Sequence, residues 1–221
     1  MSYYPVFLDL RDRSCLIVGG GEVALGKIRN LLGAGARVKV VAPYVNEGLQ
    51  ALSEQGTVDV VARPYDSADV RGFHLVIAAT DELEVNQRVS ADAEKAGVLV
   101  NVVDCPELSS FIAPAVLERG ELQVAVSTSG ASPAFAAYLR DELRAEIGPE
   151  YEVLLRLLRR VREQLRSESR SMSERKLVVR GLCSAGLVDC VRRGDRGRVD
   201  ALLREHAGPG SSLDALGVEI G

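Results

Sequence analysis

The sequence predicts an α/β fold in which a parallel sheet is followed by helices. Strand-like runs recur that are almost entirely apolar, as expected for strands buried on both faces of a parallel sheet. Segments with helical spacing of apolar residues separate several of these runs, notably at 22–32 and 84–96. The runs are 16–18, 38–42, 58–62, 75–79, 98–103 and 122–126. Alternation of this kind is typical of a doubly wound sheet with right-handed crossovers.

The first strand ends in a run of three glycines that opens the first helix. Gly19, Gly21 and Ala24 fit the G-x-G-x-x-G/A pattern of dinucleotide-binding folds. In that pattern the first glycine permits the turn, the second lets backbone approach a pyrophosphate, and the third small residue lets the helix pack on the strand. Any sharp turn can use glycine, but the position after the first strand favours a Rossmann-type nucleotide site. We expect the phosphates at the helix N-terminus, beside Glu22 and Val23.

The second strand ends without the acid that usually bonds the ribose hydroxyls of NAD. Its last residues are V-V-A-P-Y, and no arginine stands there to bind a 2′-phosphate. We therefore expect Pro43 and Tyr44 to shape the adenosine end through backbone groups and packing, and the missing cation favours NAD over NADP. After the fourth strand, Thr80 is a candidate contact with the cofactor, whereas Asp81 is equally a candidate cap of the next helix.

Asp104 follows the fifth strand in the segment N-V-V-D-C-P. A carboxylate at the carboxyl-terminal tip of a strand, beside the nicotinamide end, is well placed for proton transfer. The alternative is a turn-forming aspartate ahead of Pro106. The residues alone leave these two interpretations open.

The composition limits the classes of protein and partner. The chain has 221 residues and a formal net charge of −4 at pH 7. It has no targeting segment and no apolar run near the roughly 18 residues of a membrane span, so we expect a cytoplasmic protein that does not enter a membrane. Four scattered cysteines without C-x-x-C spacing indicate reduced thiols, and with only two histidines we expect no resident metal site.

The carboxyl-terminal third changes character. A helix is expected from Pro133 to Gly148, and from Tyr151 onward a small bundle of helices at 151–167, from 173, and at 198–206. The residues from Gly208 onward are expected to be loosely ordered. Residues 156–180 carry nine basic side chains against three acidic ones. These either form a solvated helix face or attract a polyanionic ligand, and no motif supports nucleic acid as a partner.

Four blocks of the sequence, in order, resemble those of a known family: F-L-D-L-R-D-R-S-C-L-I-V-G-G-G-E-V-A, V-I-A-A-T-D, N-V-V-D-C-P-E-L-S-S-F-I-A-P-A and V-A-V-S-T-S-G-A-S-P-A-F-A. The family is that of the precorrin-2 dehydrogenases and sirohydrochlorin ferrochelatases, which includes the amino-terminal part of bacterial siroheme synthase. The resemblance covers residues 3–205. It implies an NAD-binding Rossmann domain at 1–113, a dimerisation region at 114–149, a helical domain at 150–221, and a homodimer.

The resemblance also implies a reaction and residue roles. Family members oxidise precorrin-2 to sirohydrochlorin with NAD⁺ in siroheme biosynthesis, and some also insert Fe²⁺. Asp104 matches the family's catalytic aspartate. The substrate is a polycarboxylate, which gives the basic stretch a possible use. Candidate contacts to the substrate are Asn101, Ser110, Ser127, Thr128 and Ser129, although the serine-rich turn also has the form of a capped helix start.

Three functions remain open at this point. The first is NAD-dependent oxidation of precorrin-2, and the second adds insertion of Fe²⁺ into its product. The third is a nucleotide-sensing regulatory module in which the Rossmann domain reports to the helices. We expect the methyltransferase half of fused siroheme synthases to be absent, so that another protein supplies precorrin-2. A functional effect of replacing Asp104 would separate the enzyme from the sensor.

Overall fold

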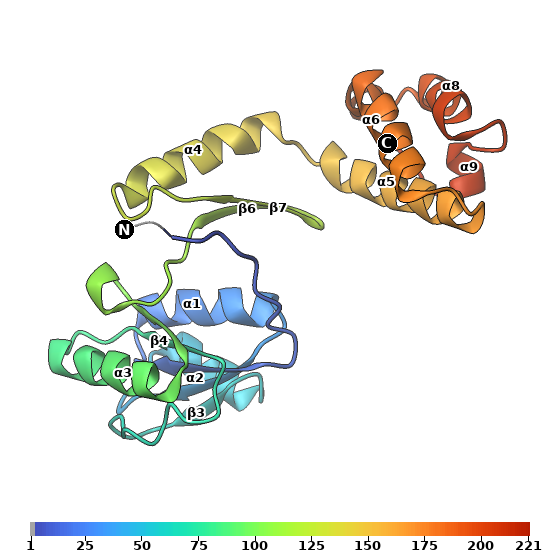
Figure 1. The fold of residues 1–221 in the computed structure, drawn as a ribbon. Helices are drawn as coiled ribbons and strands as arrows, with labels where there is room; N and C mark the ends of the chain where they lie inside the picture. The colour runs from blue at the N-terminus through green and yellow to red at the C-terminus, as the bar shows by residue number, and fades with distance from the viewer. Residues whose placement is uncertain (1–2) are drawn as a thin grey trace. The chain divides into compact units, whose positions relative to one another are not determined.

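The computed structural model describes residues 3–221. The chain folds into two compact units (Figure 1). One unit runs to Ala113 and includes Ser129–Ala131, and the other comprises Pro114–Thr128 and Ser132–Gly221.

The first unit is built on a five-stranded parallel sheet with the strand order β3-β2-β1-β4-β5. The strands are β1 (Ser14–Val18), β2 (Arg37–Val41), β3 (Asp59–Val61), β4 (Leu75–Ala78) and β5 (Leu99–Val102). The chain extends the sheet outward from β1 to β3 and then returns to place β4 on the other side of β1. Ligands of open α/β sheets bind where the strand order reverses in this way, at the carboxyl ends of the strands. The prediction of a Rossmann-type α/β fold is confirmed.

Helices cover both faces of this sheet. They are α1 (Glu22–Gly33), α2 (Glu47–Glu54) and α3 (Leu83–Ala96). Successive residues of β1 point to opposite faces: Ile17 packs in one core with Ile28 of α1, whereas Leu16 packs in the other with Val89 of α3. The two apolar cores explain why the strands read as continuous apolar runs.

The second unit begins with an antiparallel hairpin of β6 (Ala115–Arg119) and β7 (Leu122–Val126), followed by α4 (Pro133–Glu146). The strand expected at 122–126 is confirmed, and it pairs within this hairpin rather than with the parallel sheet. A two-residue connection, Gly120-Glu121, returns the chain directly onto β6, which a parallel pairing does not allow. Every second residue of β7 is exposed, so this strand is buried on one face only.

The rest of the second unit is a bundle of helices around one apolar core. The helices are α5 (Glu150–Ser167), α6 (Met172–Ser184), α7 (Leu187–Arg192), α8 (Arg196–Ala207) and α9 (Leu213–Leu216). The expected helical region is confirmed, with α7 and α9 as additions. The expectation of a loosely ordered end is wrong, because Leu213, Val218 and Ile220 are buried in the core. Among residues 3–221, no helix is both long and apolar enough to cross a membrane.

Candidate functional site

The turn between β1 and α1 depends on two glycines. Gly19 has φ of +127°, and its N–H donates to the carbonyl of Val41 at 3.1 Å. A Cβ at Gly19 would overlap the carbonyl oxygen of Ala79, and one at Gly20 would overlap that of Tyr44. The turn is therefore enclosed by the connections that follow β4 and β2. The sequence pattern assigned no role to Gly20, since its constraint comes from a residue far along the chain.

Gly21 faces open space at the start of α1. A Cβ there would meet no atom within 4 Å, and Gly21 caps the helix without a side-chain hydrogen bond. The first-turn N–H groups of Glu22 and Val23 therefore have no side-chain cap, and they lie at the positive end of the helix dipole. Ala24 is fully buried against the sheet, as a close packing of helix on strand requires. This opening fits the backbone approach of a pyrophosphate.

The connection after β2 carries no acid, but an acid reaches it from α1. Asn46 caps α2 by accepting a hydrogen bond from the N–H of Leu49 at 2.9 Å. Its amide Nδ2 donates to Oε1 of Glu22 at 2.6 Å. The side chains of Pro43 and Tyr44 are exposed on the same connection. In the sequence, Glu22 was identified only as part of the glycine motif, and Asn46 was missed. The one pattern that could have pointed to Asn46 is its position as the N-cap of a helix.

Thr80 lies in the connection between β4 and α3 and is held by Asn86. The Thr80 hydroxyl donates to Oδ1 of Asn86 at 2.8 Å and accepts from the N–H of Glu82 at 3.2 Å. Glu82, not Asp81, is the cap residue of α3, so the alternative that Asp81 caps this helix is wrong. The N–H of Glu82, at the start of α3, is already hydrogen-bonded to the Thr80 hydroxyl. Asn86 is buried at a core-facing position of α3, where a polar residue was the only sequence signal.

Asp104 lies just beyond β5 with its side chain exposed. Its φ is +57°, a left-handed conformation that aspartate tolerates better than most residues. The flanking backbone is fixed, since Val103 donates to the carbonyl of Ala78 at 2.9 Å and Cys105 to that of Val102 at 3.2 Å. Asp104 therefore occupies a turn and also presents a carboxylate at the ligand-binding edge of the sheet. The turn is confirmed, whereas the role of Asp104 in proton transfer stays a prediction.

Asn101 and Ser110 have structural partners. Asn101 is buried, and its amide donates to the carbonyl of Phe111 at 3.0 Å. The Ser110 hydroxyl accepts from the N–H of Val100 at 2.8 Å, and that of Ser109 accepts from Val102 at 2.9 Å. The two serines thus cover the free edge of β5 in place of a sixth strand. A contact of Asn101 or Ser110 with substrate stays a prediction.

The serine-rich turn is divided between the units. Thr128 follows β7 and accepts a hydrogen bond from the N–H of Ser132 at 3.0 Å. Ser132 in turn caps α4 by accepting from Phe135 at 3.2 Å, with Pro133 at the first helical position. Ser127 is an exposed residue of the second unit, and Ser129, with φ of +53°, is an exposed residue of the first. The capped helix start is present, while substrate contacts of Ser127, Thr128 and Ser129 stay predictions.

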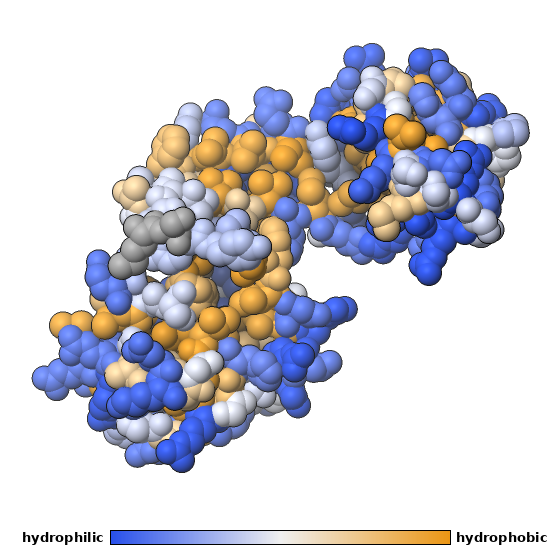
Figure 2. All heavy atoms as spheres, viewed as in Figure 1, coloured by the Kyte–Doolittle hydropathy of each residue, from blue (hydrophilic) through white to orange (hydrophobic). Residues whose placement is uncertain are grey.

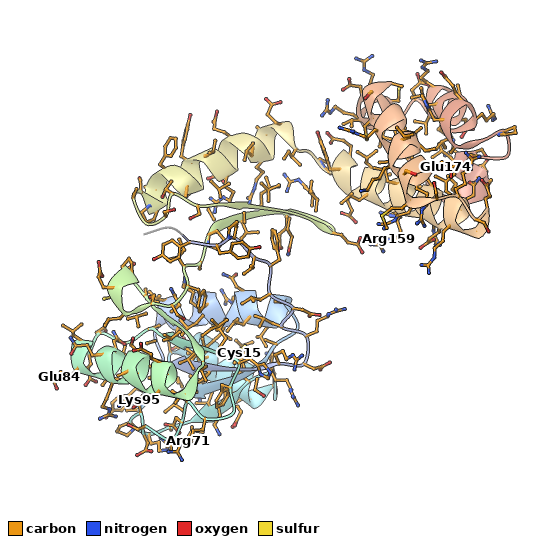
Figure 3. All side chains as sticks on the ribbon, in the orientation of Figure 1. Cys15, Arg71, Glu84, Lys95, Arg159 and Glu174 are labelled. Atoms are coloured by element: carbon orange, nitrogen blue, oxygen red, sulfur yellow. The ribbon has the colours of Figure 1, made fainter. Side chains whose placement is uncertain are left out.

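The arginines at the start of the basic stretch are paired with acids. Arg156 pairs with Glu152 at 3.6 Å. Arg159, which is labelled in Figure 3, pairs with Glu121 in the hairpin turn. These residues border a hollow of about 290 Å³. Figure 2 shows hydrophilic residues covering much of the visible surface of the helical bundle. Ion pairs of this exposed kind contribute about 0–1 kcal/mol each, so these two arginines fit the solvated-face interpretation.

Two segments of the chain match models of known protein families. Residues 6–115 match a family model described as putative NAD(P)-binding, and residues 119–146 match one described as the central part of a sirohaem biosynthesis protein. A siroheme synthase of Chromobacterium violaceum is 39% identical over 212 residues, which cover 96% of this chain and 45% of that protein. Siroheme synthase 1 of Aeromonas salmonicida is 38% identical over 226 residues, covering 100% of this chain and 48% of that protein.

The chain thus spans about half the length of these curated relatives. Among solved structures, SirC, a precorrin-2 dehydrogenase, is similar with a TM-score of 0.71 and 28% sequence identity. The similarity covers 81% of this chain and 89% of that one.

Proposed function

This chain belongs to the family that forms the amino-terminal part of bacterial siroheme synthases, and we propose that it oxidises precorrin-2 to sirohydrochlorin with NAD⁺. The observation that carries the proposal is the open, uncapped turn at Gly21, at the switch point of the sheet. This turn occurs in a chain that resembles a solved precorrin-2 dehydrogenase over most of its length.

The dinucleotide would be held by backbone more than by side chains. The N–H groups of Glu22 and Val23 would bond the pyrophosphate, and the absence of a Cβ at Gly21 would give it access. Pro43 and Tyr44 would border the adenosine. Thr80, fixed by Asn86, would face the other half of the cofactor. When bound, NAD⁺ supplies the hydride acceptor.

Asp104 is the proposed catalytic residue. Removal of a hydride from precorrin-2 leaves a cationic macrocycle, which then loses a proton as conjugation extends. A carboxylate beside that macrocycle stabilises the positive charge and accepts the proton. Asp104 makes no hydrogen bond or ion pair within residues 3–221, so its oxygens are available for both tasks.

The assembly and the substrate contacts belong to the same proposal. The polar edge of the substrate would be bound by Asn101, Ser110, Ser127, Thr128 and Ser129.

We propose a cytoplasmic homodimer formed through residues 114–149. The dimer is supported by the exposed apolar face of α4. There the rings of Phe135 and Tyr138 stack with their centroids 6.2 Å apart, and Leu139 is exposed on the same helix. Large exposed aromatic side chains are typical of protein interfaces.

Iron insertion is a second candidate. The relatives are named as synthases of siroheme, the iron-containing product, which supports a lyase activity that takes Fe²⁺ as a substrate after oxidation. The described residues hold no group of three His, Cys, Asp or Glu side chains in metal-binding geometry. A chelatase must release its metal into the macrocycle, so Asp104 would serve here by collecting pyrrole protons.

The decisive experiment is anaerobic incubation of the chain with precorrin-2 and NAD⁺, followed through NADH and sirohydrochlorin absorbance. We expect NADH to form in step with sirohydrochlorin, and no NADH would overturn the dehydrogenase. Fe²⁺ is then added. Metallation far above the protein-free rate would establish the second activity, whereas persistent sirohydrochlorin would leave the dehydrogenase alone. If the chain binds NAD⁺ but replacement of Asp104 changes no enzymatic activity, the result would instead favour the regulatory module.

A further inference from the structure

The adenosine end of the site lacks the side chain that usually distinguishes NAD from NADP. In NAD-binding folds an acid at the end of the second strand bonds the ribose hydroxyls, and an arginine there accepts the 2′-phosphate of NADP. Here β2 ends at Val41 and is followed by Ala42, Pro43 and Tyr44, and no lysine or arginine occurs before Leu49. The connection at 42–46 therefore supplies neither group, and the first acid beyond it is Glu47 at the start of α2.

Glu22 brings a carboxylate to this place from the neighbouring helix. It is the first residue of α1, its side chain is exposed, and its Oε1 accepts a 2.6 Å hydrogen bond from Asn46. Asn46 belongs to the connection between β2 and α2. The acid therefore lies against the connection that the adenosine ribose faces in this fold.

Asn46 is fixed well enough to hold that acid. Its N–H donates to the carbonyl of Gly20 at 2.9 Å, and its Oδ1 accepts from the N–H of Leu49 at 2.9 Å. With the bond from Nδ2 to Glu22, Asn46 joins the glycine turn, the cap of α2 and the carboxylate. A hydrogen bond to a charged acceptor is about twice as strong as one between neutral groups, which favours a single orientation.

The hydrogen bond from Asn46 also keeps the Glu22 carboxylate away from the position of the phosphates. A free carboxylate in the first turn is attracted to the unbonded N–H groups at the helix N-terminus. There it would compete with a pyrophosphate for the same donors and repel it. Holding Glu22 toward Asn46 leaves the N–H groups available and sets the negative charge to one side.

We propose that Glu22 is the residue that selects NAD over NADP, and that Asn46 is its positioning residue. A carboxylate accepts hydrogen bonds from both ribose hydroxyls, whereas a 2′-phosphate in their place meets it as a like charge. This inference rests on the proposed function in that the chain binds NAD, and it adds the group that discriminates against NADP.

The test measures binding of NADH and NADPH to the full chain by fluorescence titration, without substrate. Glu22→Gln keeps the shape of the side chain and its acceptor for Asn46 but removes the charge. Asn46→Ser keeps a cap for α2, because serine is a good N-cap, but is too short to reach Glu22. Glu47→Gln, an exposed acid in the next position, is the matched control for loss of a nearby negative charge.

We expect wild type to bind NADH at least about tenfold more tightly than NADPH, because like charges across a binding site are costly. Glu22→Gln should reduce that ratio to about threefold or less, and Asn46→Ser should reduce it with little change in Tm. The double variant should add little to Glu22→Gln, since both act through one carboxylate. Glu47→Gln should leave the ratio unchanged.

Equal affinity of wild type for both nucleotides would overturn the inference. An unchanged ratio in Glu22→Gln, or an equal loss of discrimination in Glu47→Gln, would do the same. Binding of NADH with discrimination, but without turnover of precorrin-2, would support this inference while the proposed function failed. Binding of neither nucleotide would overturn both.

Discussion

Asn86 holds Thr80 with both halves of its side-chain amide. Oδ1 accepts from the Thr80 hydroxyl at 2.8 Å, and Nδ2 donates to the Thr80 carbonyl at 2.9 Å. Asn86 is buried on α3, and Thr80 is half-buried. Because Ala79, the preceding residue, abuts Gly19, this pair fixes one wall of the glycine turn.

Replacement of Asn86 by alanine should therefore weaken both the fold and the cofactor site. Loss of Asn86 as a partner of the half-buried hydroxyl and carbonyl of Thr80 costs about 1–3 kcal/mol, and we expect the free energy of unfolding in urea to fall by that amount. NADH affinity should fall as the connection after β4 loosens. Gln87→Ala, an exposed neighbour on the same helix, should change stability by less than about 0.5 kcal/mol. An Asn86→Ala protein as stable as this control would show that the pair is incidental.

Three glycine-to-alanine variants should behave in three different ways. Gly20→Ala drives a Cβ into the carbonyl of Tyr44, so we expect a strongly destabilised protein. Gly21→Ala has free space and should fold normally, yet it obstructs the pyrophosphate and should weaken NADH binding. Gly26→Ala, in the open interior of α1, should stabilise by about 0.5–1 kcal/mol. Thermal unfolding and NADH titration together separate these cases, and normal NADH binding by Gly21→Ala would contradict the proposed site.

Local pattern sufficed for the parts of this fold that depend on neighbours in sequence. Buried parallel strands are apolar throughout and helix starts carry capping residues, so the α/β order, the glycine turn and the start of α4 at Pro133 were predictable. The strand at 122–126 was predictable, but β6 and its antiparallel pairing with β7 were not, because burial alternates along these strands whereas their sequences, AVLER and LQVAV, do not alternate clearly.

Long-range contacts account for what the pattern missed in the site. The constraint on Gly20 comes from Tyr44, and the partner of Glu22 is Asn46, 24 positions away. Neither pair has a spacing that identifies it before the second strand is placed beside the first. Asn86 is different, because its partner Thr80 lies only six positions earlier, in the connection that precedes α3.

Asp104 calls for two substitutions because it forms a turn and carries a carboxylate. Asparagine tolerates the left-handed φ of +57°, so Asp104→Asn should keep the stability of wild type while losing the proton acceptor. Asp104→Ala should also lose activity, and its stability should fall by less than about 1 kcal/mol, because alanine adopts the left-handed conformation less readily than aspartate. Precorrin-2 turnover and urea unfolding measure the two effects. Near-normal turnover by Asp104→Asn would leave the residue as a turn former only.

Burial should make Cys15 unreactive and make stability depend on alkaline pH. Desolvation raises the pKa of the Cys15 thiol to about 11, whereas an unfolded thiol has a pKa of about 8.5. Above the lower value the unfolded state loses its proton first, so the free energy of unfolding should fall as pH rises from about 8.5 to 11. Cys15→Ala should flatten this dependence. At pH 8 a thiol reagent should modify exposed Cys183 and reach Cys15 only after unfolding; rapid labelling of Cys15 in the native protein would refute its burial.

The carboxyl-terminal tail should contribute to the stability of the helical bundle. Ile220 is buried against the core formed by α5 to α9, and Val218 two positions earlier is buried with it, as in an extended segment lying on an apolar surface. Ile220→Ala removes packed methyl groups and should lower the free energy of unfolding by about 2 kcal/mol, near the lower end for buried isoleucine because the site lies close to the chain end and can relax. Glu219→Ala, between the two buried residues but exposed, should have little effect. Chemical unfolding followed by helical circular dichroism compares the variants, and equal stabilities would mean that the tail is not held on the core in solution.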